Sequence, residues 1–309
     1  MRRRILGLCG GAVLLLGILA ACQDPGSITR VLDALGGPGG GGGNVGTVGS
    51  YAASAVKGVT AIAHASEEFT PEQEYYIGRS VGASLLTKYP PVNDPRANAY
   101  VNEVGQALAM FSDMPQTYGG YHFLIMDSTD INAFAAPGGL IFITRGMLHC
   151  CAGENALAAV LAHEIGHVQN KDALRAIKRS RVTEALAVIG GEAVKQASGG
   201  NLPQLTSLFT DCIGDIMSTM VNNGYSRELE FAADKTAVTI LTRSGYNPAG
   251  LPIMLAEMQK RLHPGGTDFA KTHPAPADRI AQLAGLARVT EITEPPARVA
   301  RFKAALGNI

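Results

Sequence analysis

The chain has 309 residues, of which 46% are hydrophobic and 17% are charged. This composition excludes a wholly disordered protein, because it supplies enough apolar side chains to bury one sizeable core or two small ones. Basic and acidic residues number 26 each. That balance excludes a strongly basic nucleic-acid-binding protein, and we expect no nucleic-acid partner.

The N-terminal segment has the organisation of an export signal. Residues 2–4 are arginines, and residues 5–20 are apolar over a length that suits an export signal and is short for a membrane-spanning helix. The sequence LAAC at 19–22 resembles the lipobox of bacterial lipoproteins, in which the cysteine is lipidated and becomes the new N-terminus. We therefore expect a signal peptide at 1–21 and a lipid on Cys22. A plain secretory signal or an uncleaved anchor is the alternative.

A glycine-rich segment follows. Residues 36–43 read GGPGGGGG, a composition that behaves as a flexible coil. We interpret residues 22–66 as a tether that holds a domain, residues 67–309, away from a membrane; an ordinary unstructured leader is the alternative. Gln23 favours the outer membrane, by resemblance to bacterial sorting rules. We expect a lipoprotein of the bacterial cell envelope that faces the periplasm.

Two features of the remaining chain bear on its environment. The apolar segments 182–198 and 202–222 are interrupted by charged residues, so we expect a water-soluble body with no further membrane span. Cys212 can pair with Cys150 or Cys151 in an oxidising periplasm, or all three can remain buried thiols. None of the three has metal-ligand spacing with a histidine or another cysteine.

The predicted elements of the body begin with helices. Thr70 and Pro71 supply a capping hydroxyl and a first-turn proline for a helix that extends to about Lys88, and Asp94 with Pro95 starts a second helix that extends to about 111. Strands are expected at 122–126, 132–135 and 140–144, and helices at 153–170, 173–197, 203–222, 224–244, 248–262, 276–288 and 295–306. We therefore predict a mainly helical α+β domain with a small sheet.

Residues 163–167 read HEIGH inside an apolar, helix-forming stretch. His163 and His167 are four residues apart, so on a helix both imidazoles point from one face and can reach one zinc ion. Glu164 stands beside them as a base for a metal-bound water. The alternative is a pair of core histidines, but each buried imidazole would then need its own hydrogen-bond partner. The pattern predicts one catalytic zinc per chain.

A catalytic zinc needs a third protein ligand and an open position. The metzincin pattern is excluded, because Asn170 and Ala173 stand where that pattern requires a glycine and a histidine. Glu184 and Glu192 are nearest to the position of a thermolysin-like glutamate ligand, but neither has the required spacing.

Glu230 is the better candidate. Glu230 and Asp234 are four apart on an expected helix, so one can bind the metal while the other braces a ligand. Here the chain resembles the gluzincin family of the CAAX-prenyl endopeptidases, HtpX-type proteases and mitochondrial Oma-type proteases, in which HExxH precedes a helix with E-x-x-x-D. The resemblance implies His163, His167 and Glu230 as zinc ligands and Glu164 as catalytic base. It implies that Asp234 either orients a ligating histidine or donates a proton.

Two further motifs support the resemblance. Residues 132–139, NAFAAPGG, are similar to the strand-turn element before the zinc helix, and residues 272–274, THP, with Arg279 are similar to the T-H-P-x-x-x-x-R element. For His273 the resemblance implies oxyanion stabilisation or a removable plug at the open zinc position; a loop-capping histidine is the alternative. We interpret Arg227 and Arg279 as structural or site-bracing. The multi-spanning members carry transmembrane helices that this chain lacks, which argues against a prenylated substrate and favours the exported LoiP- and BepA-type branch.

These features lead to two functional hypotheses. The first is a zinc-dependent endopeptidase of the bacterial cell envelope that hydrolyses misfolded or misassembled proteins, and Glu164 within an intact HExxH favours it. The second is a periplasmic chaperone or peptide-binding module with a zinc-organised groove and little proteolysis. The strand at 132–135 suggests that an extended peptide binds as an added strand; alternatively, Gly138 and Gly139 merely form a tight turn.

Overall fold

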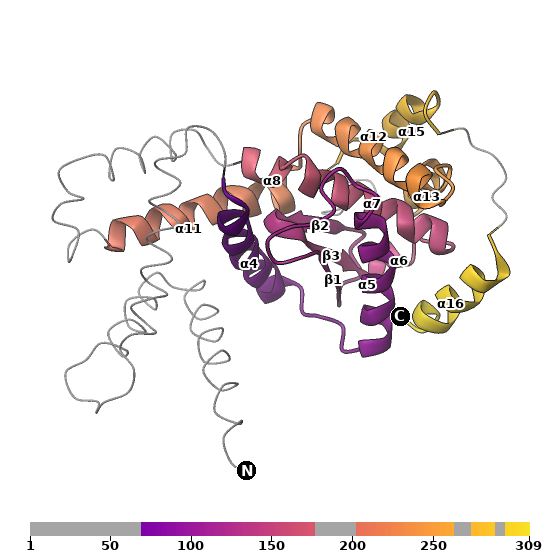
Figure 1. The fold of residues 1–309 in the computed structure, drawn as a ribbon, viewed down its shortest axis with the longest axis horizontal. Helices are drawn as coiled ribbons and strands as arrows, with labels where there is room; N and C mark the ends of the chain where they lie inside the picture. The colour runs from indigo at the N-terminus through magenta and orange to yellow at the C-terminus, as the bar shows by residue number, and fades with distance from the viewer. Residues whose placement is uncertain (1–68, 177–201, 263–272, 288–293) are drawn as a thin grey trace, which may run out of the picture.

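The computed structural model describes residues 69–176, 202–262, 273–287 and 294–309 (Figure 1). The expected signal peptide, the Cys22 anchor and the whole of the expected tether lie outside these residues. The helices are α4 (Pro71–Lys88), α5 (Pro95–Ala109), α6 (Arg145–Leu148), α7 (Glu154–Gln169), α8 (Asp172–Arg175), α11 (Leu202–Ser218), α12 (Arg227–Ser244), α13 (Gly250–Arg261), α15 (Pro276–Leu283) and α16 (Pro296–Leu306). The strands are β1 (His122–Met126), β2 (Ala133–Ala136) and β3 (Leu140–Thr144).

The predicted mainly helical α+β architecture is confirmed. The α5 helix starts as expected: the Asp94 carboxylate accepts hydrogen bonds from the backbone N–H groups of Arg96 and Ala97. The helix expected at 224–244 starts later, at Arg227. It is delayed because α11 continues into a π-helix, Thr219–Asn223, before the chain turns at Gly224 with a φ of 73°. Of the helix expected at 173–197, only the part that ends with α8 lies within the described residues.

The sheet has the order β1-β3-β2. Strand β1 is parallel to β3, with His122 opposite Leu140, whereas β2 is antiparallel to β3, with Ala136 opposite the same leucine. A short 3₁₀ turn, Pro137–Gly139, joins β2 to β3. Strand β2 therefore forms one edge of the sheet, and its outer backbone edge has no β-partner among the described strands.

Alternation along the strands divides the apolar side chains between two cores. In β3, Ile141 and Ile143 pack in the core formed with α5, α7 and α13, whereas Phe142 packs in the core formed with α4 and α11. Figure 1 shows α12, α13 and α15 grouped on one side of the sheet and α4 with α11 on the other. Cys150 and Cys151 remain buried thiols in the first core, whereas Cys212 packs against the second. The bridge to Cys212, one of two alternatives, is therefore not formed.

Helix α7 is buried along nearly its whole length, and α12 crosses it closely. The glycine within HEIGH permits this approach. A Cβ atom at Gly166 would lie 3.0 Å from the carbonyl oxygen and 3.2 Å from the Cα atom of Ala233 on α12. The close approach brings the first turn of α12 beside the two histidines of α7.

The N-terminus of α7 is held by the C-terminal part of the chain. The Glu294 carboxylate accepts hydrogen bonds from the backbone N–H groups of Glu154 and Asn155, at 3.2 and 2.6 Å, which satisfies donors at the positive end of the helix dipole. The buried Glu154 carboxylate in turn accepts bonds from Tyr100, Tyr246 and Arg301. These contacts anchor α16 against α5 and α7.

Among the described helices, none combines the length and the apolar character needed to cross a bilayer.

Candidate metal centre

Four potential ligands from three parts of the fold meet at one point. His163 and His167 come from consecutive turns of α7, Glu230 from the first turn of α12, and His273 from the segment before α15. One ligand atom from each residue lies within 4.8 Å of the ligand atoms of the other three. His163, His167 and Glu230 are each at most 2% exposed. The structure thus brings together residues that are 110 positions apart in the sequence.

Distances between the donor atoms suit a single four-coordinate ion. The Nε2 atoms of His163 and His167 are 3.1 Å apart. Nε2 of His163 lies 3.5 Å from Oε2 of Glu230, and Nε2 of His167 lies 3.5 Å from Oε1 of the same carboxylate. Two ligand atoms that each lie about 2.0–2.1 Å from a tetrahedral metal are separated by roughly 3.3 Å. The three pairs therefore match the spacing that a shared metal would impose.

The Glu230 carboxylate provides an independent test of this fit. The side chain is fully buried, and neither carboxylate oxygen has a hydrogen-bond partner. A buried carboxylate without hydrogen bonds is costly unless a cation compensates it. The Arg279 guanidinium lies 3.9 Å from Oε2 of Glu230, too far for a hydrogen bond. A metal ion bound among these residues would supply a closer cation, so the donor set fits a metal.

His163 is oriented by a buried acidic residue and a buried arginine. Its Nδ1 atom lies 3.0 Å from Oδ1 of Asp234 and 3.2 Å from Nη2 of Arg279. Arg279 is fully buried and forms a two-pronged ion pair with Asp234, at 2.9 and 2.5 Å. Burial opposes the charge on Asp234, but the guanidinium outweighs it and holds the pKa of this carboxyl below its usual value. The ionised Asp234 accepts the Nδ1 proton and leaves Nε2 of His163 available to a metal.

His167 is oriented by a different carboxylate. Nδ1 of His167 lies 2.8 Å from Oδ2 of the fully buried Asp172, and the Arg175 guanidinium donates to the other oxygen at 3.3 Å. The chain reaches this position through Lys171, which adopts the left-handed conformation with a φ of 57° and pairs with Glu74 of α4. This turn directs α8 back toward the end of α7.

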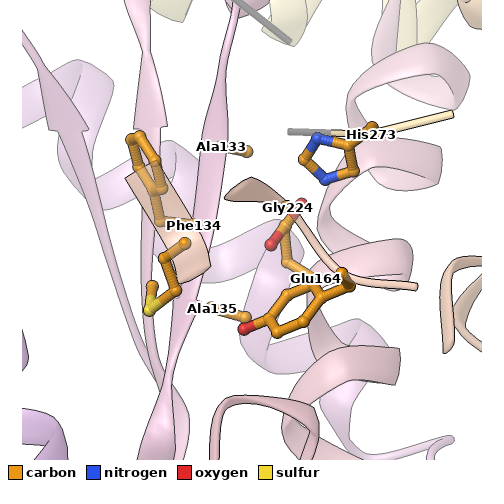
Figure 2. A pocket seen from close by; sticks show the side chains of 8 residues that line it. Ala133, Phe134, Ala135, Glu164, Gly224 and His273 are labelled. Carbon is orange, nitrogen blue, oxygen red and sulfur yellow. The ribbon is translucent and has the colours of Figure 1, made fainter. Parts of the chain in front are cut away.

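A pocket lies between this centre and the edge of the sheet (Figure 2). Its lining residues are Ala133, Phe134, Ala135, Glu164, Met220, Gly224, Tyr225 and His273. Glu164 is 2% exposed, and burial raises the pKa of its carboxyl above the usual value. A buried carboxyl with a raised pKa is suited to proton transfer. The pocket thus places the Glu164 carboxyl and His273 of the ligand cluster beside residues of β2.

The remaining residues that the sequence singled out lie partly at the centre and partly away from it. His273 reaches the centre, with its Nε2 atom 3.5 Å from Oε1 of Glu230. Arg227 forms an exposed ion pair with Asp278. Glu184 and Glu192, the rival ligands, lie outside the described residues.

Sequence reasoning missed two neighbours of His167. Asp172 follows it by five positions, and an acidic residue just after HExxH is a weak signal that could have identified it. Tyr225 lies against the His167 ring, with ring centroids 4.6 Å apart. Arg279 was noted in a motif, but its contact with both Asp234 and His163 could not be read from spacing.

The chain is similar in sequence to several known proteases. The beta-barrel assembly-enhancing protease of Escherichia coli (strain K12) is 28% identical over 215 residues, which cover 68% of this chain and 42% of that protein. The mitochondrial metalloendopeptidase OMA1 of Schizosaccharomyces pombe is 26% identical over 65% of this chain and 55% of its own length. The metalloprotease LoiP of Escherichia coli (strain K12) is 28% identical over 52% of this chain and 61% of its own length. The chain thus spans less than two thirds of the length of each of these relatives.

A family model matches a larger share of the chain. Residues 95–287 match peptidase family M48, and this range includes α7, α12 and His273. The match covers more than half of the chain. The chain therefore belongs to peptidase family M48, a family of metalloproteases.

Proposed function

We propose that this protein is a zinc-dependent endopeptidase of the bacterial cell envelope that cuts misfolded or misassembled proteins. The observation that carries the proposal is the meeting of His163, His167 and the Glu230 carboxylate, whose oxygens have no hydrogen-bond partner, at one point beside Glu164. Two imidazoles and one carboxylate are a donor set that catalytic zinc uses in peptidases. His163, His167 and Glu230 are the proposed ligands.

A bound zinc ion supplies a Lewis acid that polarises the scissile carbonyl and lowers the pKa of water to about 7. Glu164 takes a proton from the attacking water and returns it to the leaving amine. Its buried position keeps bulk water from competing for that proton. Asp234 and Asp172 hold the two imidazoles in the tautomer that presents Nε2, so both act as positioning residues.

The substrate binds along β2 in this proposal. The outer edge of β2 has no described β-partner, and Ala133, Phe134 and Ala135 line the pocket that contains Glu164. An extended peptide can pair with this edge through backbone hydrogen bonds. The small side chains of Ala133 and Ala135 leave room for it. Because such pairing reads the backbone, we expect broad sequence specificity, which suits unfolded substrates.

His273 has two possible roles in the proposal. Its Nε2 atom lies in the ligand cluster, which supports a plug at the fourth position of the metal. When a peptide displaces it, the same imidazole can stabilise the developing oxyanion. Replacement of His273 by alanine distinguishes the two roles, because it raises turnover if the plug limits activity and lowers turnover if oxyanion stabilisation dominates.

The cellular setting rests on the N-terminal sequence and on the relatives. The lipobox-like LAAC at 19–22 supports a lipid anchor on Cys22 that faces the periplasm, and Gln23 supports the outer membrane. One relative is named a beta-barrel assembly-enhancing protease, which supports unfolded or misassembled envelope proteins as substrates.

Purified protein and casein test the proposal. We expect degradation that a chelator abolishes, that zinc restores and that Glu164→Gln eliminates while zinc remains bound. If wild-type and His273→Ala proteins bind zinc and unfolded peptide but cut neither casein nor peptide, the endopeptidase proposal is wrong. That result would instead support the chaperone or peptide-binding hypothesis.

A further inference from the structure

Tyr225 carries a buried hydroxyl that has no hydrogen-bond partner. Three buried tyrosines of the described core have one: Tyr100 and Tyr246 donate to Glu154, and Tyr121 donates to the carbonyl oxygen of Met114. A buried hydroxyl without a partner is uncommon in native structures, because it loses its bonds to water without replacement. The exception therefore requires an explanation at this position.

The position of Tyr225 connects it to the proposed chemistry. The residue follows the π-helix and Gly224, two positions before the first residue of α12, and its ring centroid lies 4.6 Å from that of His167. It lines the same pocket as Glu164 and the β2 edge (Figure 2). Gly224 and Tyr225 thus line the same pocket as Glu164 and the residues of β2.

Packing alone does not explain a tyrosine here. A phenylalanine would make the same ring contact with His167 and would avoid the cost of burying a hydroxyl. The hydroxyl is a neutral donor at physiological pH, since an ordinary phenol has a pKa of about 10. A donor held in the pocket without a partner is available to an acceptor on a bound ligand.

We propose that Tyr225 is a further catalytic residue, whose hydroxyl donates a hydrogen bond to the carbonyl oxygen of the peptide bond being cut. A peptide paired with β2 brings its carbonyl groups into the pocket that Tyr225 and Glu164 share. As water adds to the carbonyl carbon, negative charge develops on that oxygen and the hydrogen bond strengthens. The tyrosine keeps its proton throughout, so Glu164 carries the only proton transfers. This inference rests on the proposed endopeptidase function.

The first test is Tyr225→Phe, which removes the hydroxyl and keeps the ring against His167. Loss of one such donor lowers kcat by roughly 10²–10³-fold in characterised hydrolases. We expect kcat on a fluorogenic peptide to fall at least tenfold, with KM, zinc content and melting temperature close to wild type. Tyr121→Phe is the matched control, because it removes a buried tyrosine hydroxyl outside the pocket; it should leave kcat unchanged. A fall in kcat of less than tenfold for Tyr225→Phe overturns the proposal.

A binding measurement provides a readout that does not need turnover. In zinc-loaded Glu164→Gln protein, a phosphinic peptide mimics the tetrahedral species and its parent peptide mimics the substrate. Adding Tyr225→Phe should weaken the phosphinic peptide at least tenfold and the parent peptide much less. Equal weakening of both ligands, or of neither, overturns the role in charge stabilisation. A wild type that cuts nothing contradicts the endopeptidase proposal itself, whereas an active wild type whose Tyr225→Phe variant keeps its kcat and its affinity for the phosphinic peptide overturns only the role of Tyr225.

Discussion

His167 donates its Nδ1–H to the buried carboxylate of Asp172 across 2.8 Å, whereas His163 makes the corresponding contact with Asp234 at 3.0 Å. The two histidines of one helix are therefore oriented by carboxylates from different elements, α8 and α12. Asp172 follows α7 directly, so its position depends on the left-handed turn at Lys171.

This relationship predicts that Asp172 contributes to metal affinity. We expect Asp172→Ala to weaken zinc binding roughly 10–100-fold, because the imidazole of His167 loses the acceptor that orients it. Competition with a chromogenic chelator measures the change. Asp113→Ala removes an exposed partner of Arg243 and should have wild-type affinity. Wild-type affinity in Asp172→Ala would show that the carboxylate does not orient the ligand.

The proposed ligand set predicts which glutamates retain zinc. Glu230→Ala should lose the stoichiometric zinc that wild-type and Glu184→Ala proteins retain, since only Glu230 places its carboxylate among the histidines of the described structure. Glu164→Gln should also retain zinc, because Glu164 acts as a base. Elemental analysis after gel filtration measures the ratio. Zinc lost from Glu184→Ala but kept by Glu230→Ala would contradict the ligand assignment.

The buried ion pair between Arg279 and Asp234 should stabilise the fold whether or not a metal is bound. Arg279→Ala leaves the Asp234 carboxylate buried without its ion pair, and such a loss costs about 3–5 kcal/mol. Arg279→Lys should recover only part of it, because an ammonium cannot form both bonds of the planar guanidinium. Urea unfolding in the presence of a chelator measures the effect. Arg227→Ala breaks the exposed pair with Asp278 and should change the free energy of unfolding by less than about 1 kcal/mol. Equal effects of the two alanine variants would refute the role of Arg279.

The buried carboxylate of Glu154 should make a contribution to stability that depends on pH. Burial favours its neutral form, but hydrogen bonds from Arg301, Tyr100 and Tyr246 outweigh burial and lower its pKa below the ordinary 4.5. A carboxyl with a lowered folded-state pKa stabilises the fold above its unfolded pKa and loses that contribution as the pH falls through the folded pKa. We expect Glu154→Gln to cost roughly 1–3 kcal/mol at neutral pH. Denaturant titrations should show the difference from wild type shrinking below pH 4.5; a constant difference would contradict the assignment.

Local sequence signals predicted most of the described elements. Asp94 and Pro95 marked the start of α5, and short apolar runs marked strands β1 and β3 with the observed bounds. The start of α12 was placed too early. Its position depends on the π-helix and on Gly224, and a π-helix has no composition that separates it from the preceding α-helix.

The sequence by itself determined how the candidate site residues are spaced along each helix. His163 and His167, like Glu230 and Asp234, are four residues apart, and helical periodicity alone puts each pair on one face. Only the tertiary structure decided that the two pairs meet, because the approach of α7 to α12 depends on packing at Gly166 and on buried charges between distant residues. For the same reason it alone showed Tyr225 beside His167: contacts between segments follow from packing and burial, which no local pattern encodes.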